Sequence, residues 1–169
     1  MTDQQKVKKI MNQKIKMLLI GLLSGIVATV LSMWLVMPSL MLTTHVSKYD
    51  DVNETALALK TAIEAAGWQC PAVRDMNVAM AKHGVTFSPP IRIVELCKAE
   101  YAKEVLSDHP EVSTLMPCAW GVYKKAGKVY ITGMNTGLMG KMFGGSIARV
   151  MGGKVSADEK TILGQVIYK

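Results

Sequence analysis

Three cysteines, Cys70, Cys97 and Cys118, are the most reactive side chains in this 169-residue chain. An odd number leaves at least one thiol free or bonded to another chain. Cys97 ends one expected strand and Cys118 begins another, so antiparallel pairing would set their Cα atoms about 4.5–5.5 Å apart, within disulfide range. Three interpretations stay open: two buried thiols, a structural or reversible disulfide, or ligation of a soft metal or cofactor.

Methionine adds a second source of sulfur, with 13 residues in the chain. Thioethers bind Cu(I) and can ligate haem iron. Met134 and Met139 are therefore candidate ligands beside Cys97 and Cys118. However, the chain has neither a C-x-x-C-H haem-attachment motif nor a C-x-x-C pair, and methionine also fills ordinary cores. The cofactor stays unknown, with a soft metal or haem as the class that these side chains would fit.

The other polar residues form no recognisable catalytic set. His45, His83 and His109 lie far apart in the sequence, and no nucleophile–base pair is apparent. The glycine-rich stretch 133–153 is not a phosphate loop, because Asn135 and Met142 replace the Gly and the Ser or Thr of G-x-x-x-x-G-K-[ST]. The sequence therefore gives an enzyme less support than a binding protein.

The same glycine-rich stretch predicts a loop that leads into a helix around residues 142–151. Phe143, Ile147, Val150 and Met151 would form the apolar stripe of that helix. Three surroundings suit the stripe: the sheet, a ligand pocket, or a membrane surface or partner.

The N-terminal region predicts a membrane anchor. No ionisable residue occurs between Met17 and Thr44, and the 21 mostly apolar residues to Met37 end at Pro38. As a helix they would span about 30 Å, the thickness of a bilayer's hydrocarbon core. A buried core helix rarely runs this long without a charge, and a cleaved signal peptide lacks its A-x-A-like site here. We expect an uncleaved anchor at 17–38, with Trp34 in the outer aromatic belt.

Basic residues before the anchor predict its orientation. Residues 1–16 hold five lysines and one acid, and so carry +4 of the formal net charge of +7. The positive-inside rule makes this tail cytoplasmic and residues 45–169 extracytoplasmic, which is the periplasm if the chain crosses a Gram-negative inner membrane once. The remaining +3 rests on 15 basic and 12 acidic side chains, so we expect no nucleic-acid binding. The expected partner is the lipid bilayer.

Small residues recur along the anchor at Gly21, Gly25 and Thr29. This spacing allows two helix backbones to approach closely, and it is also common in membrane helices in general. Helix pairing is therefore a hypothesis for this segment.

Residues 45–169 are expected to form one α+β domain with a small, mainly antiparallel sheet and packed helices. Predicted helices are Val52–Ala66, capped by Asp51 and closed by Gly67, then 76–82, capped by Asp75, and 99–107. Predicted strands are 43–49, 68–73, a central strand at 91–97, and the hairpin 118–124 and 128–134. A capping box at Ser156–Glu159 predicts the start of a terminal helix.

The order of four stretches is specific: R-I-V-E-L-C-K at 92–98, L-M-P-C at 115–118, G-V-Y-K-K at 121–125 and M-N-T-G-L-M-G-K-M-F-G-G at 134–145. Together with the helix before Gly67-Trp68, they resemble the Domain of Unknown Function 302 family over about 120 residues. The resemblance implies an α+β fold and homodimers, and it carries no assigned reaction. Cys97 and Cys118 match the cysteine pair of one branch, whereas Cys70 has no match. The anchor is an addition to the common stand-alone form.

Two functional hypotheses follow. The first is a membrane-anchored extracytoplasmic binding or redox-accessory module that uses the Cys97 and Cys118 pair. The second is a dimeric, non-catalytic structural or interaction subunit of a membrane complex.

Overall fold

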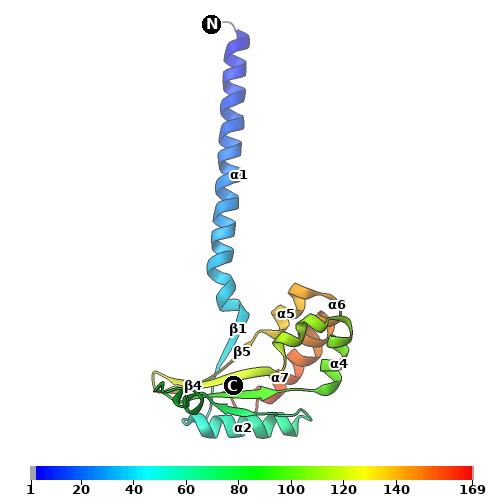
Figure 1. Cartoon of the computed structure of the whole chain (residues 1–169). Helices are drawn as coiled ribbons and strands as arrows, with labels where there is room; N and C mark the ends of the chain where they lie inside the picture. Colours follow the sequence, from blue (N-terminus) through cyan, green and yellow to red (C-terminus); the bar gives the residue numbers. More distant parts are fainter. Residues whose placement is uncertain (1–2, 169) are drawn as a thin grey trace. The chain divides into compact units, whose positions relative to one another are not determined.

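The computed structural model describes the backbone of residues 3–168 and the side chains of residues 13–168 (Figure 1). The lysine side chains at positions 6, 8 and 9 of the expected basic tail lie outside the described part. The chain divides into two compact units, Met1–Ser39 and Leu40–Lys169. Each unit is described by itself below.

The first unit consists of helix α1 (Asp3–Met41), which continues three residues beyond Pro38. Its segment Gln13–Met41 is long and apolar enough to cross a membrane, and none of it is buried in the protein. The hydroxyl groups of Ser24 and Thr29 donate to the carbonyl oxygens of Gly21 (3.0 Å) and Gly25 (2.8 Å). The polar side chains of this stretch therefore find partners within their own helix, as a lipid environment would require.

The second unit is an α+β domain built on a five-stranded antiparallel sheet of order β1-β5-β4-β3-β2. This confirms the predicted fold class. The strands are β1 (Leu42–Val46), β2 (Val73–Asp75), β3 (Ile91–Leu96), β4 (Cys118–Lys125) and β5 (Lys128–Met134). The central strand is β4 and not β3, because β3 pairs with the short edge strand β2 on its outer side.

The helices lie mainly on one face of this sheet. They are α2 (Val52–Ala65), α3 (Met76–Ala81), α4 (Ala99–Asp108), the 3₁₀-helix η1 (Pro110–Leu115), α5 (Thr136–Phe143), α6 (Gly145–Ile147), the π-helical η2 (Ala148–Val155) and α7 (Ser156–Leu163). Helix α2 runs along the sheet and contacts β3, β4 and α7 (Figure 1). Three helical segments, α6, η2 and α7, follow one another without an intervening loop.

The core forms where alternating strand residues meet the helices. Val94 faces Trp120 across β3 and β4, and Val122 faces Ile131 across β4 and β5; all four side chains are buried. They pack with buried residues of α2 and the α6–α7 run, among them Leu59 and Ile162. The opposite face carries Tyr123 and Tyr130, which stack on each other at 5.8 Å between ring centroids.

Local capping determines several boundaries as predicted. The Asp51 side chain accepts hydrogen bonds from the backbone N–H groups of Asn53 (2.8 Å) and Glu54 (2.9 Å), which begins α2. Gly67 follows with φ +74°, a left-handed conformation that suits glycine at a helix end. Asp75 caps α3 in the same way. The hairpin turn at Ala126 and Gly127 is also confirmed, with φ values of 48° and 79° that match a type I′ turn.

Three local predictions were wrong. The expected strand 68–73 contributes only an isolated bridge between Gln69 and Cys97 before β2 begins at Val73. Helix α7 begins at Ser156 as predicted, but the capping box does not form, because Ser156 itself is helical, with φ −60° and ψ −32°, and no side chain of the described residues caps the helix. The loop expected before the 142–151 helix is itself helical, since α5 occupies Thr136–Phe143, and the helical run from Gly145 to Val155 covers much of the predicted helix.

Candidate functional site

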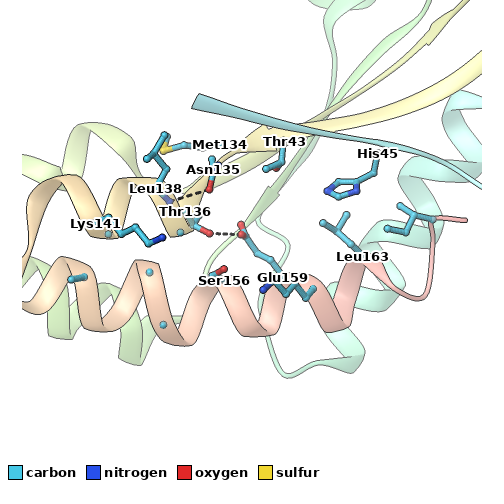
Figure 2. Close-up of a pocket in the computed structure, with 17 residues that line it drawn as sticks. Thr43, His45, Met134, Asn135, Thr136, Leu138, Lys141, Ser156, Glu159 and Leu163 are labelled. Atoms are coloured by element: carbon cyan, nitrogen blue, oxygen red, sulfur yellow. Dashed lines mark hydrogen bonds between the residues drawn. The ribbon is translucent and has the colours of Figure 1, made fainter. Parts of the chain in front are cut away.

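The domain contains a pocket of about 750 Å³ between α5, the η2–α7 run and the beginning of β1 (Figure 2). Its lining combines small and apolar residues with several polar groups. The polar side chains are those of Thr43, His45, Asn135, Thr136, Lys141, Ser156, Glu159 and Lys160. We call this cavity the α5–α7 pocket. Its size lies in the range of pockets that hold small organic molecules.

A buried carboxyl group, that of Glu159, belongs to this pocket. The residue is 9 % exposed, and it accepts a 2.6 Å hydrogen bond from the Thr136 hydroxyl (Figure 2). Burial raises the pKa of Glu159 to about 7, although the Thr136 bond acts in the opposite direction. Among the residues that the structure describes, no cationic side chain forms an ion pair with Glu159. The carboxyl is therefore about half protonated near neutral pH.

Close glycine contacts position the two helical walls of the pocket. A Cβ atom at Gly140 of α5 would lie 2.6 Å from the Cα atom of Gly152 in η2, so only hydrogen atoms fit between the two backbones. Gly153, next to Gly152, also lines the pocket, and a Cβ atom there would meet nothing within 4 Å. The contact between Gly140 and Gly152 fixes the spacing of the two helical walls. Gly153 has open space around its Cβ position.

The N-terminus of α5 is tied to the beginning of β1 through Asn135. The Asn135 side chain accepts a hydrogen bond from the N–H of Leu138 (3.0 Å), which caps the helix. Its amide nitrogen donates to the Leu40 carbonyl (3.0 Å), and its backbone N–H donates to the Met41 carbonyl (2.8 Å). One residue therefore joins α5 to the end of α1 within the second unit.

Basic groups surround the opening of the pocket. The Lys141 side chain extends towards Thr136, and the His45 ring lies beside Leu163 (Figure 2). Lys141 and Lys160 are both exposed residues that line the pocket. With two lysines and one carboxyl group, the lining carries a net positive charge, which increases as Glu159 is protonated.

The expected Cys97 and Cys118 pair is not formed. Cys118 pairs with Leu96 in the sheet register, and Cys97 lies one residue further along, bridged to Gln69. Because Cys97 is offset by one residue from the position that faces Cys118, the two cysteines do not form a directly opposed pair, although both border the same small cavity. All three cysteines are free. The expectation of adjacent sulfurs at one edge was therefore wrong by one residue of register.

The surroundings of Cys118, which is half-buried, disfavour its thiolate form. Desolvation raises its pKa to about 12, with smaller contributions from Glu159 and Cys97. Both Cys97 and Cys118 border a small cavity of about 20 Å³, which has room for one water molecule. A thiol in this state is a poor nucleophile, because the thiolate is the reactive form.

The two candidate methionines do not gather with the cysteines. Met134 lines the α5–α7 pocket, and Met139 lines a different cavity of about 10 Å³ together with Phe143 and Ile147. The predicted sulfur-rich set of Cys97, Cys118, Met134 and Met139 is therefore divided among three places. Within the described residues, no group of three His, Cys, Asp or Glu side chains is arranged to hold a metal ion.

A second polar cluster lies on the other side of α7, around Asp158. Its carboxylate accepts hydrogen bonds from Trp68 Nε1 (3.0 Å), Lys98 Nζ (3.3 Å) and the Tyr101 hydroxyl (3.2 Å). Burial alone would raise the pKa of Asp158, but these donors outweigh it and hold the pKa below its usual value. Since every partner comes from the protein, this cluster joins α4 to α7 and leaves little capacity for a ligand.

Sequence analysis missed Glu159, Thr136 and Lys141 as members of a site. The S-x-x-E pattern drew attention to Glu159, but it was interpreted as a helix cap. The tertiary contact from Thr136 to Glu159 joins residues 23 positions apart, and no local pattern indicates it. The Gly140–Lys141 pair lay inside the stretch tested as a phosphate loop, so the composition was informative although the motif was absent.

Comparisons with known proteins agree with this architecture. Residues 43–160 match the model of a family described as domain of unknown function DUF302. No curated protein matches the chain. A crystal structure described as an uncharacterized conserved DUF302 protein from Bacillus stearothermophilus superposes with a TM-score of 0.64 at 20 % identity, covering 74 % of this chain and 97 % of that one. The chain therefore belongs to the DUF302 family, whose fold its C-terminal unit adopts.

Proposed function

We propose that the protein is a membrane-anchored extracytoplasmic binding module, and that the α5–α7 pocket takes a small, weakly acidic molecule with an apolar body. The observation that carries this proposal is a pocket of about 750 Å³ built around a buried carboxyl group without an ionic partner in the described chain. Burying a polar group without full satisfaction costs free energy, so such a group is retained where it meets a ligand more often than in a plain core.

The lining supports a ligand of mixed character. Leu138, Leu163 and Ile167 give apolar contact surface, and the polar groups are few and convergent, as in small-molecule sites generally. At pH values below about 7, Glu159 is mainly protonated and can donate a hydrogen bond to an anionic oxygen. Lys141 and Lys160 add positive charge at the rim. An anionic head group is therefore favoured over a cationic one, and more strongly as the pH falls.

Saturation-transfer NMR on the full chain in nanodiscs tests this proposal with octanoate as the probe. We expect a signal at pH 6 that weakens by pH 8, because ionised Glu159 repels the carboxylate. Gly153→Phe should abolish it, because Gly153 lines the pocket and a Cβ atom there meets nothing within 4 Å, which leaves the new ring room to occupy the cavity. Ala157→Phe, an exposed position one turn further along, is the matched control and should bind normally.

Three results would contradict the binding proposal. They are an octanoate signal that survives Gly153→Phe, one that Ala157→Phe removes equally, or one that octylammonium reproduces with the same pH dependence. Lys141→Gln gives an independent check, because it removes a rim charge without filling the pocket. It should weaken octanoate binding and leave the thermal midpoint unchanged.

The location of the module follows from α1 in this proposal. Its apolar segment and the lysines that precede it support a single-pass anchor in the inner membrane, with a cytoplasmic N-terminus and an extracytoplasmic domain. Protease should digest the domain when it is added to intact spheroplasts. It should leave the domain intact when it is added to inverted vesicles. Protection in spheroplasts with digestion in inverted vesicles would reverse the orientation.

A second candidate function, a dimeric interaction subunit of a membrane complex, has one observation in its favour. The sheet face that carries Tyr123 and Tyr130 is only partly covered, and both rings are half-buried. A second copy would cover them further. Light scattering of the full chain in detergent would support this function if it gave a dimer that Tyr130→Lys dissociates, and a monomer would remove it.

A further inference from the structure

The C-terminal end of α5 exposes two large apolar side chains side by side in sequence. Met142 is 51 % exposed and Phe143 is 55 % exposed. The expected stripe of the 142–151 region divides at this point, because Ile147, Val150 and Met151 are buried against the domain while Phe143 is half in solvent. We call Met142 and Phe143 the α5 tip. Its exposure needs an explanation, because transfer of these apolar side chains out of water is favourable in free energy.

The backbone after the α5 tip turns the chain away from it. Gly144 and Gly145 both have positive φ, at 71° and 55°, a region that favours glycine. A Cβ atom at Gly144 would meet nothing within 4 Å, so no crowding forces glycine here. The backbone conformation favours glycine here, and it separates α5, which ends at Phe143, from α6, which begins at Gly145.

The other end of α5 is fixed to the residues that follow the expected anchor. Asn135 binds the carbonyl oxygens of Leu40 and Met41 at 3.0 and 2.8 Å. Eight residues of α-helix extend about 12 Å, so the α5 tip lies within roughly that distance of Asn135. Leu40, Met41 and Leu42 are themselves 49 %, 43 % and 55 % exposed. Exposed apolar side chains therefore also occur where the chain leaves α1.

We infer that the α5 tip inserts into the headgroup layer of the same bilayer that holds α1. The inference rests on the anchor part of the proposed function and goes beyond its binding pocket. Chain length supports the bilayer over a free protein partner. The hydrogen bonds of Asn135 hold the start of α5 at Leu40 and Met41, and the α5 tip is only one eight-residue helix away from them. Phenylalanine and methionine at such a depth exchange water for the acyl boundary, as in interfacial helices.

This placement has a consequence for the α5–α7 pocket. Lys141 precedes the α5 tip directly and also lines the pocket. With the tip in the headgroup layer, the mouth of the pocket lies next to the lipid surface, and an amphiphile reaches it without crossing bulk water.

Tryptophan quenching by brominated lipid tests the inference on the full chain in nanodiscs. Trp34→Phe removes the anchor tryptophan, and the remaining Trp68 and Trp120 are buried in the domain at 5 % and 2 % exposure. Phe143→Trp in this background should show blue-shifted emission and lose about half its added fluorescence to dibrominated phospholipid. Leu57→Trp, at an apolar site on α2 that is 65 % exposed, is the matched control and should remain unquenched.

The outcomes separate this inference from the anchor itself. Quenching of Trp34 in the otherwise unchanged chain shows that α1 is in the bilayer, and its absence would remove the anchor and the inference together. If Trp34 is quenched and Phe143→Trp is not, the anchor holds and the inference fails. Equal quenching of Phe143→Trp and Leu57→Trp would also overturn it, because contact would then not be specific to the α5 tip.

Discussion

Two regions of the domain contain side chains that could take part in chemistry. They differ in how completely protein atoms surround those side chains. Cys97, just after β3, and Cys118, at the start of β4, are offset by one residue in register and border one cavity of about 20 Å³. At the α5–α7 pocket, Glu159 faces a cavity of about 750 Å³ with one side-chain partner, Thr136. The first region is closed and the second is open. Residue type alone therefore misleads, because reactivity depends on the space and the partners that surround a group.

The largest expected effect concerns the closed region. Burial raises the pKa of Cys118 to about 12, so at pH 8 its thiolate fraction is about 10³-fold below that of an unperturbed thiol. We expect iodoacetamide to label Cys118 in the native full chain much more slowly than in urea, as measured by peptide mapping, although the higher nucleophilicity of a high-pKa thiolate offsets part of the lower thiolate fraction. Comparable native and denatured rates would mean that the thiol is accessible, and the contrast between the regions would disappear.

The open region depends on the contact between Gly140 and Gly152. Gly140→Val should destabilise the domain by about 3 kcal/mol, because backbone atoms of Gly152 occupy the space that the new side chain needs. The thermal midpoint should fall by about 10 °C, measured by tryptophan fluorescence of the full chain in detergent. Gly153→Ala is the control; it lies in a helix with open space around its Cβ and should be neutral or slightly stabilising. Equal effects at both positions would disprove the close-packing argument.

The carboxyl of Glu159 predicts an unusual pH dependence. Its pKa is about 7 in the folded chain and near the ordinary glutamate value of 4.5 when unfolded, so the folded state binds more protons between these values. Its contribution to stability is therefore full below pH 4.5 and is lost as the pH rises to 7, by at most about 3 kcal/mol. Glu159→Gln should flatten this dependence and be more stable than the parent at pH 8. An unchanged pH profile would show that Glu159 is not buried as described.

The smallest expected effect belongs to the satisfied cluster at Asp158. Asp158→Asn should cost about 1 kcal/mol at pH 7, because the carboxylate is partly exposed and its three donors keep some partners. Asp50→Asn, at an exposed position before α2, should cost nothing measurable. Octanoate binding should be the same in both variants, and a loss of binding in Asp158→Asn would extend the site beyond the α5–α7 pocket.

Local signals in the sequence predicted much of the fold and little of the site. The Asp51 and Asp75 caps, Gly67 and the Ala126-Gly127 turn act through neighbouring residues, and each was identified correctly. The position of Cys97 relative to Cys118 depends on strand register, which a shift of one residue reverses.

The site itself arises from contacts between distant segments. Thr136 meets Glu159 only after α5 packs on η2 through Gly140 and Gly152. The glycines of this stretch were noticed, but their role is to allow helix packing, which no phosphate-loop motif describes. The failed capping box at Ser156 has the same origin, because tertiary packing continues the helix through a residue that usually begins one.

One comparison tests the central claim that ligand binding belongs to the open region and not to the cysteines. Octanoate binding at pH 6 is measured for the full chain in nanodiscs with Gly153→Phe and, separately, with Cys97→Ser combined with Cys118→Ser. The account predicts that Gly153→Phe abolishes binding and that the double serine variant binds like the parent. Binding that survives Gly153→Phe but is lost in the folded serine variant would contradict it.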